Sequence, residues 1–383
     1  MRKIGFTLLL CICAASVWGQ RATALLAKAK AETDPQVQIK LLTQAVEKSP
    51  NLADAYHYRA DAYRRLGKHK QAVEDYSRTI KLRPKDAFRY YARALDYMDT
   101  QHWSLALADL NEAISLKPSY KNFYRARAQV YLHLGKHEQA VADYEQSRPP
   151  ADDKMIMEMM PAYIGAYRYD KALRLLDKSS RADSAPGHYW RGRIFFGRNE
   201  LDEAVSCFSK SINRDTTFSA AYRYRANAFK EMGDLEAALA DYTTLLALQP
   251  DALFYNRRGI VYEELGQFAN AQDDYTKAIE LNPKWAIPFN NRGFVRIHLK
   301  NWDGAKKDLE TAISLDNSAP TPYINLAGWY WLSKKDRNKA YANLDNALKR
   351  NFKDIESLYK EDKKGWMFKG LNQTSQFRAL IYQ

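Results

Sequence analysis

Hydrophobic residues along this chain recur at spacings of three and four, which is the period of one face of an α-helix. Residues 53–86 contain two such stretches, with Ala60 on the apolar face of the first and Ala72 on that of the second. Gly67 separates them and can take the left-handed conformation that ends a helix, and Pro84 stops the second stretch. The pattern therefore predicts a helical hairpin.

This hairpin pattern returns with a period close to 34 residues. The phrase LGKHKQAVEDY begins at Leu66, LGKHEQAVADY begins 68 positions later at Leu134, and looser copies begin at Met232 and Leu265. A fixed period of this length indicates a stack of repeated supersecondary units. About ten units are predicted, starting near residues 19, 53, 87, 121, 153, 185, 219, 252, 286 and 321.

Small residues mark the predicted contact between the two helices of each hairpin. A glycine or alanine on the first helix is followed twelve positions later by an alanine on the second, which would let the two backbones approach closely. The pairs are Ala60/Ala72, Ala94/Ala106, Ala128/Ala140, Gly192/Ala204, Ala226/Ala238, Gly259/Ala271, Gly293/Ala305 and Gly328/Ala340. Because one hairpin cannot bury both of its faces, neighbouring hairpins must stack on each other.

Together, the flanking aromatic residues, the small residue, the alanine of the second helix and the closing proline resemble the tetratricopeptide repeat (TPR) family. The resemblance covers nearly all of the chain after residue 19. It implies an all-α fold, a right-handed α-solenoid of about ten helical hairpins with a C-terminal capping segment. We expect a first array over residues 20–150, a second over residues 151–350, and a helical cap over residues 351–383, where the period is lost.

The fifth unit departs most from the pattern. Pro149 and Pro150 cut the preceding helix short, Pro161 falls inside the next one, and half of the eight methionines of the chain lie in MIMEMM, residues 155–160. A core filled with adaptable side chains and a binding surface or hinge both fit this composition. We predict a bend in the stack near residues 148–165.

An arginine just before the small residue also recurs. A basic residue once per helical repeat could contact one nucleotide per unit. The arginines are Arg59, Arg93, Arg127, Arg191, Arg225, Arg258 and Arg292, and the aspartates that follow sixteen positions later are Asp75, Asp109, Asp143, Asp241, Asp274 and Asp308. In the unit of Arg191, Cys207 stands in place of the aspartate. Because the units without the arginine also lack the aspartate, we predict a partly buried ion pair within each of the other six repeats and no nucleic-acid partner.

The first nineteen residues have the pattern of a signal peptide. Arg2 and Lys3 precede an apolar run that ends near Val17, and Gly19 stands before the polar Gln20. The run is shorter than the roughly 20 residues that span a bilayer. We expect an exported protein in the periplasm or associated with the cell envelope, with an extracellular location and an N-terminal membrane anchor as alternatives.

The formal charge of the chain is +14. Such a charge favours acidic polypeptides or envelope polyanions as partners, and it is compatible with peripheral association with an envelope complex. Cys207 is the one cysteine outside the first nineteen residues, which excludes an internal disulfide in the rest of the chain. The sequence leaves the oligomeric state open.

Motifs of catalysis are absent from the sequence. It contains no glycine-rich phosphate loop, no cysteine pair at metal-binding spacing and no nucleophile elbow. His69, His102 and His137 recur in the turn between the two helices of a hairpin, where a solvated polar residue is expected. We therefore predict a non-enzymatic protein with no cofactor and no metal.

In TPR proteins, ligands lie in the concave groove formed by the first helices. The resemblance therefore assigns groove positions to Phe88, Tyr91, Arg125, Gln129, Met157, Tyr189, Arg193, Phe196, Arg223, Asn227, Asn256, Asn290, Phe294, Asn325 and Trp329. Aromatic, arginine and asparagine side chains suit an extended peptide. Arg223 and Asn227 match the carboxylate clamp of chaperone-binding TPRs only in part.

The hypothesis that follows is a non-catalytic scaffold or adaptor of the bacterial cell envelope that binds polypeptides in this groove. A binder of envelope polyanions or glycans, using the basic and aromatic surface, is the alternative. Salt would distinguish the two, because a charge-dominated complex weakens as salt rises whereas buried aromatic anchors do not.

Overall fold

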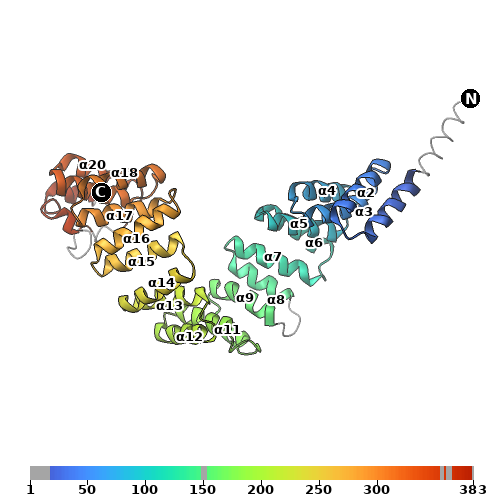
Figure 1. Ribbon diagram of the computed structural model, residues 1–383, viewed down its shortest axis with the longest axis horizontal. Coiled ribbons are helices and arrows are strands. Elements are labelled where there is room, and N and C mark those ends of the chain that lie inside the picture. Colours follow the sequence, from blue (N-terminus) through green and yellow to red (C-terminus); the bar gives the residue numbers. More distant parts are fainter. Residues whose placement is uncertain (1–17, 148–152, 354–357, 359–364, 382–383) are drawn as a thin grey trace, which may run out of the picture. The chain divides into compact units, whose positions relative to one another are not determined.

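The computed structural model describes residues 18–147, 153–353, 358 and 365–381, and its regular secondary structure there is helical throughout (Figure 1). The chain divides into two compact units, Met1–Ser180 and Arg181–Gln383. The proposed signal sequence and residues 148–152 of the predicted bend lie largely or wholly outside the described residues. The array boundary at residue 150 and the bend therefore stay predictions.

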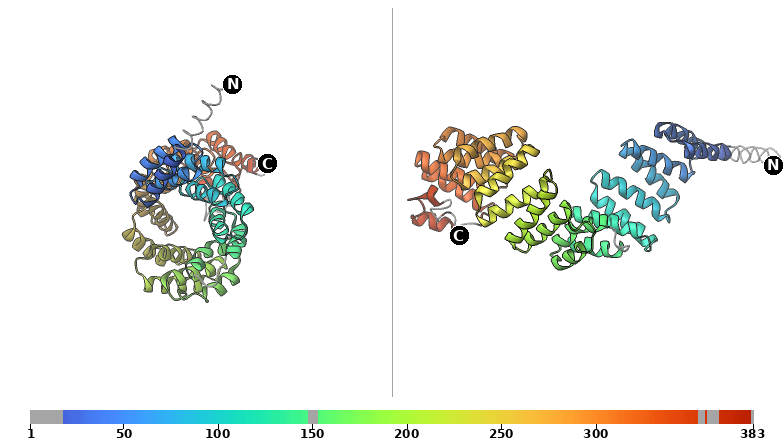
Figure 2. Two further views of the ribbon diagram at one scale, coloured as in Figure 1. Left: turned by 90° about the vertical axis from the view of Figure 1, so that its right-hand side faces the viewer. Right: turned by 60° about the horizontal axis from the view of Figure 1, so that its bottom comes forward.

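The first unit is a series of helical hairpins, each packed on the next (Figures 1 and 2). A helix over residues 18–31 buries Leu26 and Ala29 against Leu42 and Ala45 of the following helix. The helices that follow are α2 (Pro35–Lys48), α3 (Ala53–Arg65), α4 (His69–Leu82), α5 (Ala87–Asp99), α6 (Trp103–Leu116), α7 (Lys121–His133), α8 (His137–Ser147), α9 (Asp153–Gly165) and α10 (Tyr169–Leu176).

The second unit continues the same scheme. Its helices are α11 (Ala185–Gly197), α12 (Leu201–Arg214), α13 (Ser219–Met232), α14 (Leu235–Leu248), α15 (Ala252–Glu264), α16 (Phe268–Leu281), α17 (Ala286–His298), α18 (Trp302–Leu315), α19 (Thr321–Trp329), the π-helix η1 (Tyr330–Lys334), α20 (Arg337–Leu348), the 3-10 helix η3 (Gly365–Phe368) and α21 (Ser375–Ile381). From α3 to α19, every first helix begins at the residue that the repeat period predicted, which confirms the hairpin architecture of an α-solenoid.

The turns inside the hairpins show why glycine recurs there. Gly67 and Gly135 have φ angles of 68° and 69°, in the left-handed region. Gln101, Asn199 and Lys300 take the same conformation in turns that lack glycine, with φ angles of 61°, 62° and 57°. The turn geometry is therefore set by the hairpin, and glycine only reduces the strain of adopting it.

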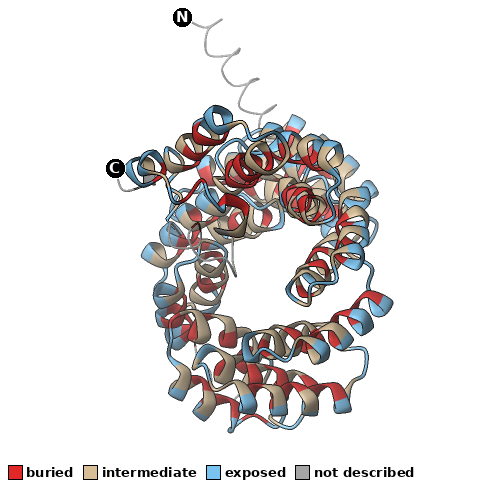
Figure 3. Cartoon of the chain, turned by 90° about the vertical axis from the view of Figure 1, so that its left-hand side faces the viewer, coloured by how far each residue is buried: buried red, intermediate tan, exposed pale blue. Residues whose placement is uncertain are grey.

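The predicted small residues are buried in all eight hairpins that carry them. Figure 3 shows the buried positions along the helices. The glycines face a side chain, because a Cβ atom at Gly259 would lie 2.7 Å from Tyr275 and one at Gly192 would lie 2.6 Å from Phe208. Gly293 is similarly close to Leu309. The small residue thus makes room mainly for the large side chain four positions after the alanine, rather than only for the facing backbone.

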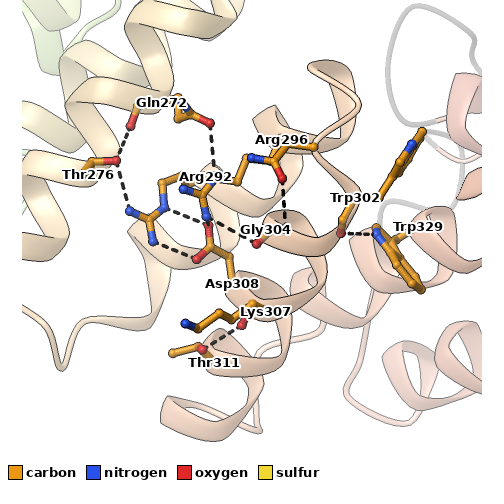
Figure 4. Close-up of polar contacts among 11 residues, drawn as sticks. Gln272, Thr276, Arg292, Arg296, Trp302, Gly304, Lys307, Asp308, Thr311 and Trp329 are labelled. Atoms are coloured by element: carbon orange, nitrogen blue, oxygen red, sulfur yellow. Dashed lines mark hydrogen bonds and ion pairs between the residues drawn. The ribbon is translucent and has the colours of Figure 1, made fainter.

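The predicted ion pairs within the repeats are confirmed. In all six, the arginine Nε and Nη2 atoms donate to the two carboxylate oxygens of the aspartate at 2.7–2.8 Å. The arginine Nη1 atom makes a third contact, at 2.7–3.2 Å, to the second helix of the preceding hairpin. Its acceptors are Thr43, Ser77, Asn111, Ser209, Thr243 and Thr276 (Figure 4 shows Arg292 with Thr276). Each arginine therefore joins two hairpins.

The fifth hairpin is irregular but well packed. Helix α9 continues through Pro161, and Met155, Met159 and Met160 are buried in its core. Helix α10 has 8 residues, whereas α4 has 14. The burial favours the interpretation that these methionines fill a core.

The C-terminal segment covers the last hairpin. Met367, Phe368 and Phe377 are fully buried against residues of α19 and α20. The indole Nε1 of Trp331 donates to the carbonyl oxygen of Lys369 at 3.0 Å. Without this segment, the apolar face of the final hairpin would be exposed. Among the described residues, no helix combines the length and apolar character needed to cross a membrane.

The contact between His298 and the C-terminal segment predicts a lower free energy of unfolding at acid pH. The His298 ring lies between Phe268 and Trp366, with centroid distances of 4.1 and 4.2 Å, and burial lowers the pKa of His298 to about 4. As pH falls from about 6.5 towards 4, the unfolded chain takes up a proton that the folded chain does not, so the free energy of unfolding decreases. Thermal unfolding at pH 7.5 and 4.5 should show a smaller acid-induced fall in Tm for His298→Phe than for the wild type. Equal falls would contradict the prediction.

A second prediction concerns the first turn of α11. A Cβ atom at Gly187 would lie 2.2 Å from the carbonyl oxygen of Arg181 and 2.4 Å from that of Ala182. Because these are backbone atoms, we expect Gly187→Ala to destabilise the second unit by about 1–3 kcal/mol, despite the better helix propensity of alanine. Urea unfolding measures the change, and unchanged or increased stability would contradict the prediction.

Candidate partner-binding face

The first helices of successive hairpins line one face of each unit. Contacts join α5 with α7 in the first unit, and α11 with α13, α15 with α17, and α17 with α19 in the second. We call this surface the first-helix face. It carries the residues that the sequence assigned to the groove.

In the first unit, the predicted aromatic residues form a cluster with two others. Phe88 packs against Tyr120 and Phe123, with centroid distances of 5.0 and 5.7 Å, and Tyr91 lies 5.0 Å from Phe123. The Lys117 ammonium group lies 4.6 Å from the Phe88 ring. Phe88 remains exposed, so this cluster offers an aromatic surface next to a positive charge.

Arg125 and Gln129 lie further along the same face, on α7. The Arg125 guanidinium group donates to Glu158 of α9 at 2.6 and 3.0 Å, so its charge is already compensated. Gln129 and Met157 are half-buried. Nothing in their described surroundings sets them apart as a binding site.

The second unit concentrates arginine around one tyrosine. The guanidinium groups of Arg193 and Arg223 lie 4.1 and 4.8 Å from the ring centroid of Tyr224. Arg193 also donates to the Tyr189 hydroxyl at 3.0 Å. Cation–π contacts of this kind fix the guanidinium planes while leaving their N–H donors available.

Next to this tyrosine is a small polar cleft of about 160 Å³. It is lined by Arg223, Tyr224, Asn227, Tyr242, Leu253, Phe254 and Arg257. Among the described residues, no carboxylate forms an ion pair with Arg223 or Arg257. Such a volume is below the roughly 300–1,000 Å³ of small-molecule sites, and it suits a single side chain or carboxylate.

The electrostatics of the cleft are positive. The Tyr242 hydroxyl donates to Asn227 Oδ1 at 2.6 Å. Burial raises the pKa of Tyr242 to about 12, while Arg257 and Arg223 act in the opposite direction. The phenol is therefore neutral near pH 7 and does not cancel the charge of the two arginines.

The predicted asparagines form a chain of hydrogen bonds instead of an open surface. Asn325 donates to Asn290 at 2.9 Å, Asn290 to Asn291 at 3.2 Å, and Asn291 to Asn256 at 3.2 Å. Asn256, Asn290 and Asn325 are buried. This series of hydrogen bonds links α15, α17 and α19, so these amides connect neighbouring first helices and are buried below the first-helix face.

Two more predicted residues are buried, and two stay accessible. Tyr189 and Trp329 are 7% and 3% exposed, and Trp329 Nε1 donates to the carbonyl oxygen of Trp302 at 2.7 Å. Phe196 and Phe294 are half-buried. Tyr189, Asn256, Asn290, Asn325 and Trp329 are therefore buried, because tight stacking of the first helices covers these positions, and their contact with a partner stays a prediction.

Sequence reasoning missed Tyr224 and Arg257, which complete the cleft. Each directly follows a predicted groove position, Arg223 and Asn256 respectively. The sequence feature that could have identified Tyr224 and Arg257 is that each is an aromatic or polar residue directly beside a predicted groove position. Which of two neighbouring helical residues faces the cleft depends on how adjacent hairpins rotate against each other.

Hairpins stacked in this way, with one face lined by first helices, define an α-helical repeat protein. The tetratricopeptide repeat profiles match residues 53–86, 91–154 and 252–284. The chain therefore carries tetratricopeptide repeats over these residues, and such repeats generally mediate protein–protein interactions.

Known proteins resemble the chain over limited regions. Human tetratricopeptide repeat protein 6 is 26% identical over 169 residues, 41% of this chain, and the match spans about a third (32%) of the relative's length. A tetratricopeptide repeat protein from Parabacteroides merdae aligns over 72% of this chain and 99% of its own, with 19% identity and a TM-score of 0.42. The crystal structure of MamA aligns over 43% and 96%, with 20% identity and a TM-score of 0.40.

Proposed function

We propose that the chain is a non-catalytic scaffold of the bacterial cell envelope that holds an acidic segment of a partner polypeptide on the first-helix face of residues 181–383. The observation that supports this proposal is the cleft between α13 and α15. There, Arg223 and Arg257 face Asn227 without a compensating carboxylate among the described residues. The N-terminal signal pattern supports export.

The proposed binding mode combines one charged anchor with aromatic contacts. A glutamate, aspartate or C-terminal carboxylate of the partner would enter the cleft and accept hydrogen bonds from the two guanidinium groups. Tyr224 and Phe196, whose rings lie 6.2 Å apart, would contact the flanking residues. Arginine and aromatic side chains in a partly desolvated pocket have the composition of binding hot spots.

Crosslinking tests the proposal directly. A photo-crosslinking amino acid would replace Phe254, at the edge of the cleft, and in a second variant Lys210 on the exposed side of α12. Each variant, starting at Gln20, would be exposed to an envelope extract, washed at about 0.15 M and about 1 M salt, and irradiated. Discrete polypeptides crosslinked from position 254 and absent from position 210 are expected.

Two other outcomes would count against the scaffold. Retention of glycan or another polyanion that is lost at high salt would favour the alternative function. Equal crosslinking from both positions would show that the first-helix face is not the binding surface.

A further inference from the structure

A cluster of three potential metal ligands lies in the first unit, away from the proposed binding cleft. His69 is the first residue of α4, and Asp96 and Asp99 lie in the last turn of α5. One ligand atom of each residue lies within 4.8 Å of the others. The cluster therefore joins one hairpin to the first helix of the next.

Asp96 is the unusual member of the cluster. Its side chain is fully buried, its Oδ1 atom lies 2.9 Å from His69 Nδ1, and its Oδ2 atom is buried without a hydrogen-bond partner among the described residues. A buried carboxylate oxygen without a partner is costly. The position at the C-terminal end of α5 adds to this cost, because the helix dipole disfavours negative charge there.

Asp99 supplies a second, more accessible carboxylate. Arg64 donates twice to its Oδ2 atom, at 2.7 and 3.1 Å, and no bond to Oδ1 is seen among the described residues. Asp96 and Asp99 are three positions apart on one helix, so both face the same side. Arg64 compensates part of the charge, but its two bonds end on Asp99 and leave the buried Asp96 oxygen unpaired.

We propose that His69, Asp96 and Asp99 bind a divalent transition-metal ion, with Zn²⁺ as the best-fitting probe. Zn²⁺ accepts imidazole nitrogen and carboxylate oxygen at about 2.0–2.2 Å. Two such ligand atoms at tetrahedral or octahedral angles stand roughly 2.9–3.4 Å apart. The distance of 2.9 Å between His69 Nδ1 and Asp96 Oδ1 falls in this range. Solvent would complete the coordination, since Asp99 lies at the surface. By coordinating residues of both, the ion would link the α3–α4 turn to the C-terminal end of α5.

The repeat itself provides a matched control. His137 stands 68 residues after His69 in the same phrase, but α9 begins 66 residues after α5, so Ala162 and Gly165 occupy the positions that correspond to Asp96 and Asp99. His137 therefore has a similar turn without the two carboxylates. Mg²⁺ provides a control of a different kind, because it prefers oxygen ligands alone.

Isothermal titration of the chain, purified without a histidine tag and freed of metal with EDTA, would measure binding of Zn²⁺ and Mg²⁺. We expect one Zn²⁺ per chain and no comparable Mg²⁺ binding. His69→Asn and Asp99→Asn should each weaken Zn²⁺ binding at least tenfold, whereas His137→Asn should leave it unchanged. No Zn²⁺ uptake by the wild type, or unchanged affinity in the first two variants, would overturn the proposal and leave His69 and Asp96 as a simple ion pair.

Hydrogen exchange of the wild type keeps the proposal testable if a variant does not fold. Zn²⁺ should slow amide exchange in residues 66–72 and 94–100 relative to the rest of the first unit. Slowing confined to other segments would place the ion elsewhere and would also overturn the proposal.

Discussion

Asp308→Ala is expected to lower the free energy of unfolding by about 3–5 kcal/mol, because removing one partner of a buried ion pair leaves the other charge uncompensated. Asp308 is 3% exposed and accepts hydrogen bonds from Arg292 at 2.8 Å and from Arg296 at 2.7 Å (Figure 4). Its loss would leave two largely buried guanidinium groups without a carboxylate. Arg292 also contacts Thr276 of the preceding hairpin, so the loss of stability should extend to that hairpin.

Urea unfolding followed by circular dichroism would measure this change, and hydrogen exchange would show whether α17 and α18 open first. Local exchange is needed because repeat arrays can unfold in steps. Glu138→Ala is the matched control, since Glu138 pairs with Arg168 where both side chains are more than half exposed. Exposed pairs of this kind contribute about 0–1 kcal/mol. An Asp308→Ala effect as small as that of Glu138→Ala would contradict the structural role of the pair.

Charge reversal in the cleft is expected to have the largest effect on binding. A fluorescent acidic peptide, selected from a random library on the wild type, would be the ligand. Arg223→Glu and Arg257→Glu should each weaken its binding by about 30-fold or more, because loss of one partner of a charged hydrogen-bonded pair costs about 2–5 kcal/mol. Fluorescence anisotropy measures the Kd.

The controls separate local contact from overall charge. Arg214→Glu makes the same charge change on exposed α12 of the same unit and should alter the Kd less than threefold in about 0.15 M salt, where surface charges are screened. Arg223→Lys should retain part of the affinity, since lysine keeps the charge but not the planar fork. Equal losses for Arg214→Glu and Arg223→Glu would show a non-specific charge effect and would argue against the cleft.

The repeat made the architecture predictable. Each hairpin buries its own small and aromatic residues, so the spacing of Ala60 and Ala72 within one unit already fixes which helix faces pack. The arginine and aspartate sixteen positions apart lie in one hairpin as well, and their pairing followed from co-occurrence along the chain. Local contacts of this kind recur with the period and need no knowledge of the neighbouring hairpins.

Contacts between hairpins were decided by tertiary structure. The third bond of Arg292, the chain of asparagine amides, and the burial of Asn325 and Trp329 depend on how tightly one hairpin rotates against the next. The same rotation brings Arg223 and Arg257 to one cleft, and it brings His69 of one hairpin close to Asp96 of the next. The sequence by itself determined the helices, their order and the pairs inside each hairpin. Only the packing of one hairpin on another decided which polar side chains are accessible, because a change in rotation moves a side chain between the surface and the interface.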